Sequence, residues 1–286
     1  MSRILRLTAS VCLTLAVAVP AFAQGKSGGK KPVKTATPPP SSSALSAPAG
    51  GQLAIGATAS PFSWLDDASV LEPGNILLGV SMLRWHGAGA TETIFPVIDA
   101  TIGLTPRVQF GANVPRVAGG LGTTFFSAKI GVLQDEVRGL YVAVSPTLEI
   151  LGGEVSSIIP SGEGRAHWGL PVSVHLDGES TRLYASSGYF SPGIWFAGAG
   201  VGVSLGDRTG LSGSFSRAWT SSSTAPTDPA VASLHRTEIT GGASYNFHPN
   251  MAVFTSLSRT LGMSADLGGG TTFGFGMSLS AAVPTR

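Results

Sequence analysis

The residues of this chain that could perform chemistry are few, and their spacing builds no familiar active site. The five histidines are His86, His167, His175, His235 and His248. A nucleophilic hydrolase needs a histidine within hydrogen-bond reach of a serine, and a third group that orients the histidine. The nearest arrangement is His235-Arg236-Thr237, which lacks the serine. We therefore predict no catalytic residues, and a hydrolase is only the third functional hypothesis.

A glycine-rich stretch, Gly198-x-Gly200-x-Gly202, has part of the spacing of a dinucleotide-binding loop. Such a loop follows a strand and begins a helix, whereas here an alternating pattern continues to Leu205 and a tight turn. No group of His, Cys, Asp and Glu has metal-ligand spacing, and the single cysteine is Cys12. The sequence thus predicts no cofactor and no metal.

The remaining polar side chains occur at alternate positions, and this predicts the elements that hold them. Ile98, Ala100 and Ile102 alternate with Asp99 and Thr101, and period two is typical of strands with two different faces. The same alternation recurs over 108–114, 126–132, 140–149, 168–176, 195–205, 238–247 and 273–280. Less regular strands are predicted at about 75–85, 181–190, 210–219 and 251–260. The total is about twelve strands.

Composition decides how these strands are arranged. Charged residues make up 12% of the chain and mean hydropathy is +0.27, whereas soluble domains carry about 25% charged residues. The net charge of +2 excludes a basic nucleic-acid binder. No uncharged apolar run beyond the N-terminal stretch is long enough for a membrane helix. Since backbone groups in lipid must pair internally, we predict an all-β fold: a closed antiparallel transmembrane β-barrel over 75–286. A soluble β-sandwich is the alternative.

The N-terminal residues resemble a targeting signal. Arg3 and Arg6 precede an apolar stretch that ends in Ala21-Phe22-Ala23, as in a secretory signal peptide. We predict a signal peptide over 1–23, so that the mature chain has no cysteine. With the barrel, this predicts the outer membrane of a Gram-negative-type bacterium.

Two further segments precede the first predicted strand. Residues 24–50 are rich in Lys, Pro and Ser and are predicted to be a disordered periplasmic linker; a basic arm for an anionic envelope polymer is the alternative. Residues 51–74 are predicted to be an entry segment that either plugs the periplasmic mouth or extends outside it. Asp66 and Asp67 in this segment could bind basic groups that point inward.

Connections of two lengths separate the strands. Tight turns are predicted at 105–107, 134–136, 177–179, 206–208 and 248–250, and mostly longer connections at about 86–94, 116–123, 151–166, 220–233 and 261–270. Residues 191–193 are a short exception. Since outer-membrane barrels have short periplasmic turns and longer outer loops, both termini are predicted to be periplasmic.

Aromatic residues cluster near strand ends on the longer-loop side, as in an interfacial girdle. The girdle candidates are Trp85, Phe95, Trp168, Tyr189, Trp195 and Trp219.

Charged and amide side chains on the non-apolar faces are predicted to point into the barrel, because an Arg or Lys facing mid-bilayer costs about 2–4 kcal/mol. The lumen and selectivity candidates are Asp99, Gln109, Asn113, Lys129, Glu149, His175, Arg182, Arg236 and Glu238. They could form a selective eyelet or a paired network, for example Lys129 with Asp99, that closes the lumen. His175 is expected to lie alone among Ser and Gly.

Two stretches resemble a known family. Residues 61–74 read PFSWLDDASVLEPG, and 99–115 read DATIGLTPRVQFGANVP. Both are similar to the outer-membrane barrel "transporter" family linked to the MetA pathway of phenol degradation. The resemblance implies a barrel that passes hydrophobic or aromatic solutes, and it implies no catalytic residues. The C-terminal Ala282-Val283-Pro284-Thr285-Arg286 departs from the terminal aromatic residue of many such barrels.

The function predicted from the sequence is an outer-membrane channel for small solutes, with hydrophobic or aromatic solutes as the class that the resemblance implies. The second hypothesis is a closed structural or surface-exposed barrel without transport. The predicted partners are outer-membrane lipid, the barrel-assembly machinery during insertion and a small-molecule solute, with no nucleic acid.

Overall fold

The computed structural model describes residues 65–87, 90–117, 120–152, 165–191, 193–220, 236–261 and 269–282. The predicted signal peptide, the linker and the first part of the entry segment lie outside these ranges. The central parts of three predicted long connections, 153–164, 221–235 and 262–268, lie outside them as well.

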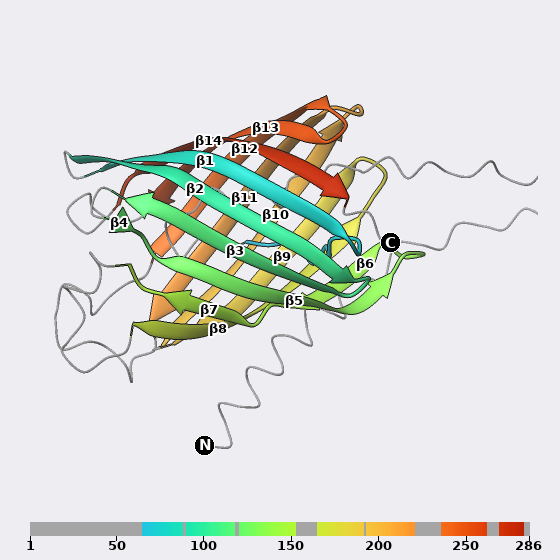
Figure 1. The fold of residues 1–286 in the computed structure, drawn as a ribbon, viewed down its shortest axis with the longest axis horizontal. Coiled ribbons are helices and arrows are strands. Elements are labelled where there is room, and N and C mark those ends of the chain that lie inside the picture. The colour runs from blue at the N-terminus through green and yellow to red at the C-terminus, as the bar shows by residue number, and fades with distance from the viewer. Residues whose placement is uncertain are drawn as a thin grey trace, which may run out of the picture. The chain divides into compact units, whose positions relative to one another are not determined.

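The described chain is a sequence of β-strands wound into one sheet (Figure 1). The strands are β1 (Asn75–Gly87), β2 (Ala90–Thr105), β3 (Val108–Val117), β4 (Gly120–Leu121), β5 (Thr124–Asp135), β6 (Leu140–Val144), β7 (Thr147–Ile150), β8 (Ala166–Asp177), β9 (Thr181–Phe190), β10 (Ile194–Leu205), β11 (Thr209–Thr220), β12 (Arg236–His248), β13 (Met251–Leu261) and β14 (Thr271–Ala282). None of the described residues forms a helix long and apolar enough to cross a membrane.

The sheet closes because its first and last strands pair. β1 and β14 run antiparallel in a register that extends from Asn75 opposite Ala282 to His86 opposite Thr271. β6 and β7 both lie between β5 and β8, so they are two halves of one wall strand. β4 pairs with the end of β3 inside a loop. The described wall is therefore a closed barrel of twelve antiparallel strands, which confirms the predicted fold.

The single strand predicted over 140–149 is interrupted at Ser145 and Pro146. Proline has no N–H to donate to the ladder, so regular pairing stops there. The wall stays hydrogen-bonded across the break, because the Ser145 N–H donates to Pro171 O at 2.9 Å and the Ala128 N–H donates to Pro146 O at 3.0 Å.

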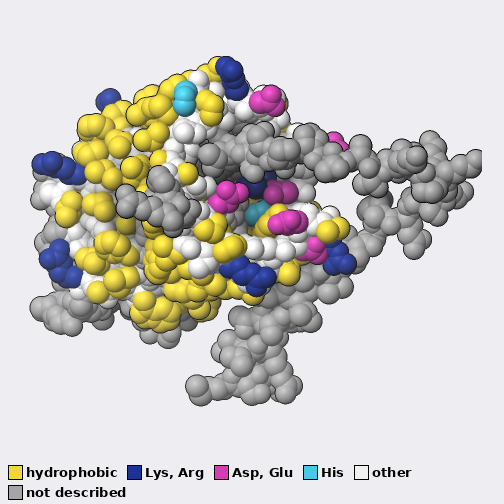
Figure 2. Space-filling model, turned by 45° about the vertical axis from the view of Figure 1, so that its right-hand side comes forward, with side chains coloured by type: hydrophobic (Ala, Val, Ile, Leu, Met, Phe, Trp, Pro, Cys, Tyr) yellow, Lys and Arg dark blue, Asp and Glu magenta, His cyan; other side chains and the backbone are white. Residues whose placement is uncertain are grey.

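The two faces of the wall differ as the alternation predicts. Residues that face outward are large and apolar and are more than a third exposed, among them Leu78, Val80, Ile98, Ile102, Phe110, Ile130, Val172, Val174, Leu183, Phe215, Ile239, Phe275 and Met277. The inward positions hold buried serines, threonines, amides and charges. Figure 2 shows hydrophobic side chains over the visible wall and charged side chains gathered at the opening of one end. Such an exterior suits contact with hydrocarbon.

This outer face predicts a large penalty for a charge. Phe215, near the middle of β11, is 51% exposed on the exterior. We expect Phe215→Arg to lower the free energy of unfolding by about 2–4 kcal/mol in liposomes, as measured by urea titration. Ser212→Arg on the inward face of the same strand is the control, and an equal loss in both variants would contradict the assignment of faces.

The two ends of the barrel differ in their connections. At one end the strands are joined by tight turns such as 206–208, where Gly206 has φ of 68°, a left-handed conformation that favours glycine.

The predicted long connection over 86–94 was wrong: β1 continues to Gly87 and β2 begins at Ala90. The register of β1 against β2 shifts between Ser81 and Leu83, and this bulge breaks the period-two pattern on which the loop boundary rested.

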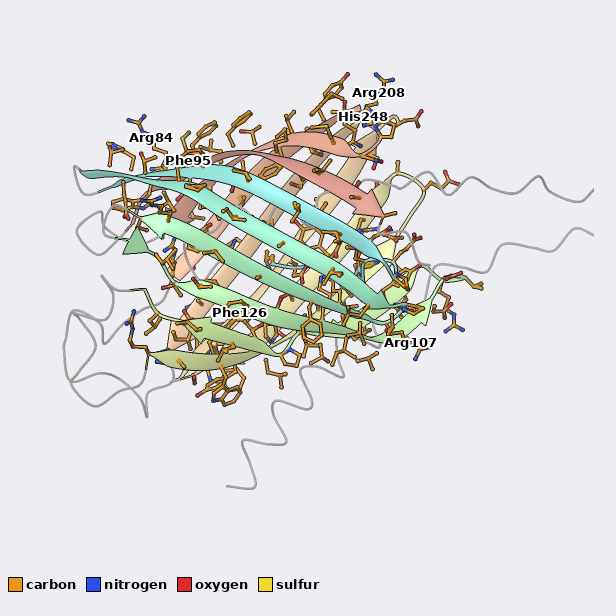
Figure 3. The ribbon with its side chains drawn as sticks, viewed as in Figure 1. Arg84, Phe95, Arg107, Phe126, Arg208 and His248 are labelled. Carbon is orange, nitrogen blue, oxygen red and sulfur yellow. The ribbon has the colours of Figure 1, made fainter. Side chains whose placement is uncertain are left out.

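The predicted girdle residues do not all lie on the exterior. Trp168, Tyr189 and Trp195 form an outer cluster, with ring centroids 5.3 Å apart for Trp168 and Tyr189 and 5.0 Å apart for Tyr189 and Trp195. Trp219 lies opposite Trp195 in the register, and Phe95 is 59% exposed. Figure 3 places Phe95 at the end opposite Arg107, Arg208 and His248, which mark the tight turns.

Trp85 is the exception among the girdle candidates. It alternates in phase with the buried Ser81 and Leu83 of β1, so it faces inward. A Cβ at Gly270 would meet its Nε1 at 2.4 Å, so the indole packs directly on that glycine. Trp85 therefore belongs to the interior, because strand parity rather than closeness to a strand end decides the face.

Candidate functional site

Residues 65–74, here called the lumen segment, lie inside the barrel near the tight-turn end. Leu65, Asp67 and Ala68 are almost fully buried, with exposures of 2%, 1% and 1%. The segment ends at the wall, where the Gly74 N–H donates to Gly103 O at 2.9 Å, just before β1 begins. Its side chains therefore meet the inward faces of strands far away in the sequence.

Lys129 on β5 holds the lumen segment at three points. Its Nζ lies 2.6 Å from Asp66 Oδ2 and donates to the backbone oxygens of Asp67 at 3.0 Å and Ser69 at 3.2 Å. The suggested pair of Lys129 with Asp99 was wrong, because the segment brings a closer carboxylate to the lysine. Lys129 itself is 4% exposed, so its charge is compensated within the barrel.

Arg182 on β9 holds the second carboxylate of the segment. Its Nη1 lies 2.7 Å from Asp67 Oδ2 and 3.0 Å from Ser69 Oγ, while its Nε lies 2.6 Å from Asp177 Oδ1 on β8. The guanidinium thus bridges the wall and the segment. Hydrogen bonds to charged groups of this kind contribute about 1.5–3 kcal/mol each.

The sequence suggested that His175 lies alone among small residues, but in the structure this side chain of β8 has several partners. Its Nδ1 accepts a hydrogen bond from the Ala68 N–H at 3.1 Å, and its Nε2 lies 3.5 Å from Asp177 Oδ2. Its ring stacks on Tyr141 with centroids 4.5 Å apart. Both ring nitrogens therefore face partners in the segment and the wall, which assigns the histidine to positioning the segment.

Small wall residues leave room for the segment. A Cβ at Gly103 would lie 2.1 Å from Glu72 O, and one at Gly198 would lie 2.6 Å from Leu65 Cδ2. Both glycines occupy inward positions, on β2 and β10. At Gly198 the backbone of the wall is therefore in close contact with the segment.

The two aspartates of the segment have opposite pKa shifts. Burial raises the pKa of Asp66 to about 6, because the nearby positive charge of Lys129 offsets the desolvation only in part. Burial also acts to raise the pKa of Asp67, but the charges of Lys129 and Arg182 outweigh it and hold that pKa below 3.8. At neutral pH both carboxylates are ionised and paired.

These shifts predict that the two aspartates together favour docking most strongly in mildly acidic solution. Between about pH 4 and 6 the docked Asp66 binds a proton that a solvated aspartate does not, so docking strengthens as the pH falls through 6. Below about pH 4 a solvated Asp67 is protonated before the docked one, so docking weakens again. From pH 7 to pH 5 the contribution of Asp66 alone would tighten docking roughly tenfold, since one pKa unit is 1.36 kcal/mol. His175 acts in the opposite direction, because a protonated Nδ1 could not accept the hydrogen bond from the Ala68 N–H.

Thiol labelling measures this pH dependence. Val70 is half-buried beside Gly131, and Glu72 is exposed. The modification rate of Val70→Cys relative to Glu72→Cys is measured in a chain without residues 1–23, with and without Asp66→Asn. From pH 7 to pH 5 this ratio is expected to change about tenfold further towards protection in the chain that keeps Asp66, because His175 and both thiols are the same in the two backgrounds. An equal pH dependence in the two backgrounds would contradict the shift assigned to Asp66.

The other predicted lumen residues lie on the inward face in separate groups. Asn113 on β3 donates to Asp99 Oδ1 on β2, its partner across the strands. Gln109 Oε1 accepts from the Leu71 N–H at 2.6 Å and so joins the contacts of the segment. Glu238 accepts from Arg236 Nη2 at 2.8 Å on β12, and Glu149 is 5% exposed on β7.

Two contributors to the site were missed from the sequence. Asp177 was assigned to a tight turn, yet it is the last residue of β8 and binds Arg182. Ser173 was not among the lumen candidates, yet its Oγ donates to Asp67 O at 3.2 Å. The alternation along β8 places Ser173, His175 and Asp177 on one face. This pattern could have identified Ser173 and Asp177 as neighbours of His175.

The described residues of the site include few of the side-chain groupings that enzymes use for catalysis. Within the described ranges no group of three or more His, Cys, Asp or Glu could hold a metal ion. Of the histidines considered for a hydrolase, His235 lies outside the described residues, and His175 faces the segment. The site can therefore bind and position polar groups.

These observations define a class: a twelve-stranded antiparallel β-barrel with an apolar exterior, a polar interior and an N-terminal segment inside. Solved outer-membrane barrels share this fold. The chain superposes on the NanC porin with a TM-score of 0.55 and 11% identity, over 71% of this chain and 98% of that one. It superposes on the COG4313 outer membrane channel from Pseudomonas putida F1 with a TM-score of 0.54 and 12% identity, over 75% and 98%.

A third solved structure, the KdgM porin, gives a TM-score of 0.52 at 6% identity, over 70% of this chain and 98% of that one. No protein-family model matches the chain, and no curated protein sequence matches it. The fold is thus that of porin-like barrels, and the resemblance to the MetA-pathway family rests on the two sequence stretches alone.

Proposed function

We propose that the protein is an outer-membrane channel for small solutes, with the lumen segment narrowing its periplasmic mouth. The observation that carries this proposal is the polar interior: the inward face holds Asp99, Gln109, Asn113, Lys129 and Glu149, where a barrel packed solid for structure would favour apolar side chains. The lumen segment compensates Lys129 and Gln109, and Asn113 compensates Asp99. A solvated or solute-filled lumen would compensate the remaining groups such as Glu149, whereas burial without partners would cost free energy. The similar fold of known porins and of a channel supports the same role.

Orientation and location follow from the same proposal. The outer face would contact outer-membrane lipid after insertion by the barrel-assembly machinery, and the tight turns would lie in the periplasm together with both termini. The arm over 24–50 would then extend into the periplasm.

The nature of the solute is a finer proposal. Hydrophobic or aromatic solutes are implied by the family resemblance, and the loop-side interior offers two apolar clusters that suit them. One contains Leu83, Ile94 and Val97, and the other contains Phe190, Phe196 and Ala218. The tight-turn end is polar, so a solute with both apolar and polar parts fits the described interior best.

A planar bilayer with the purified chain tests the channel. Discrete current steps are expected, together with liposome swelling that falls off as solute size increases. A barrel that inserts, as judged by heat-modifiable migration on a gel, but gives neither current nor swelling would contradict the proposal.

Those negative results would instead support the second candidate, a closed barrel without transport. One observation favours it: Lys129, Arg182 and His175 tie the lumen segment to three wall strands. If these contacts persist in the membrane, the segment seals the lumen. The effect of releasing the segment, considered in the Discussion, separates a removable constriction from a permanent seal.

A further inference from the structure

A small cavity lies between the lumen segment and the wall formed by β2, β3, β5 and β8. Asp66 lines it from the segment, Asp99 and Asn113 from β2 and β3, and Ser127 and Ser173 from β5 and β8. Phe125 and Pro171 give it an apolar side. The lining of the cavity therefore combines polar and apolar groups.

The polar lining includes carboxylate oxygens that could accept further hydrogen bonds. Asp66 Oδ1 is buried and, within the described part of the chain, has no hydrogen-bond partner. Asp99 accepts from Asn113 on one oxygen, and no described cation lies within ion-pair distance of its carboxylate. A buried acceptor without a donor costs about 1–3 kcal/mol, so a ligand that supplies donors would be stabilised here.

Hydroxyl, amide and ammonium groups of the wall line the cavity, but none of those described donates to Asp66 Oδ1. The ammonium of Lys129 has three hydrogens, and it already faces Asp66 Oδ2 and the backbone oxygens of Asp67 and Ser69. Around the cavity the charges of Asp66 and Lys129 cancel, which leaves the single negative charge of Asp99. The missing partner is therefore a compact group with one positive charge and several N–H donors.

We propose that this cavity binds the head of a primary alkylammonium ion. The ammonium donates to Asp66 Oδ1 and to the Asp99 carboxylate, with the serine hydroxyls as further acceptors, and the alkyl chain lies against Phe125 and Pro171. An alcohol would lack the charge, and a carboxylate would be repelled by Asp99. The inference rests on the proposed channel in that it names a solute class for the same lumen.

Titration calorimetry with n-butylammonium tests the site. The purified chain is held at pH 8, where Asp66 is ionised, in a non-ionic detergent that does not itself attract cations. We expect saturable binding of butylammonium and at least tenfold weaker binding of 1-butanol and butyrate. Equal binding of butanol, or no saturable heat with butylammonium, would overturn the proposal.

Three variants locate the binding. Asp99→Asn is expected to weaken butylammonium binding about tenfold, the loss expected for one charge-assisted hydrogen bond. Ser127→Leu, which fills the cavity, is expected to abolish binding. Glu238→Gln is the control, because this buried carboxyl lies on β12 beside Arg236 and does not line the cavity. Heat-modifiable migration confirms that each variant is folded.

Unchanged binding in both Asp99→Asn and Ser127→Leu would place the ligand elsewhere and overturn the site. The outcome is independent of transport, since binding is measured without a current. Butylammonium binding in a barrel that carries no current would support the site and overturn the channel. Current without butylammonium binding would support the channel and overturn the site.

Discussion

Lys129→Met is expected to release the lumen segment and to raise the labelling rate of Val70→Cys about a hundredfold. The substitution keeps the length of the side chain but removes the charge that lies 2.6 Å from Asp66 Oδ2 and the donors to two backbone oxygens. Removing one partner of a buried ion pair costs about 3–5 kcal/mol, because the other charge stays buried without compensation. A cost of this size is enough to expel ten residues that are held mainly by polar contacts.

A double-mutant cycle separates the ion pair from the rest of the lysine. Asp66→Asn in the Lys129→Met background removes the uncompensated carboxylate, so the labelling rate should fall back part of the way towards that of the unaltered segment. Arg236→Met, which removes a wall cation that contacts Glu238, is the matched control and should leave the rate unchanged. A Lys129→Met chain that labels as slowly as its parent would mean that other contacts hold the segment.

The strand pattern was predictable because it depends on neighbours in the chain. Alternate residues of a strand point to opposite faces, so the apolar residues at Ile98 and Ile102 place Asp99 and Thr101 on the inner face. The same parity gave the inward positions of Gln109, Asn113 and Lys129. It failed where the backbone itself shifts phase, as at the bulge of β2. It persisted across Pro146, where only the regular pairing is interrupted, because Ser145 and Thr147 are both buried.

The partners of the lumen side chains were not predictable from period two. Lys129 pairs with a carboxylate more than sixty residues away, and Arg182 reaches Asp67 across 115 positions of the chain. Such contacts depend on the register of every intervening strand and on the path of a segment that has no periodicity of its own. The aspartates of the entry segment suggested basic partners, but only the three-dimensional arrangement selects Lys129 and Arg182 from among the basic side chains.

Deleting residues 51–70 is expected to raise the single-channel conductance several-fold and to shift its selectivity towards anions. The deletion removes Leu65, Asp67 and Ala68 from the interior, where they are almost fully buried, so more of the lumen becomes open. It also removes the carboxylates that compensate Lys129 and Arg182. Two cations then face the lumen with fewer partners, and a basic lining favours anions.

Planar-bilayer recordings with a potassium chloride gradient measure both effects, conductance from the current steps and selectivity from the reversal potential. Deleting residues 24–43 removes the same number of residues from the linker and should change neither quantity. A larger current with unaltered selectivity would mean that Lys129 and Arg182 do not face the permeation path. An unchanged current would show that the lumen segment does not limit passage, and the narrow part of the channel would then have to lie among wall residues such as Arg236 and Glu238.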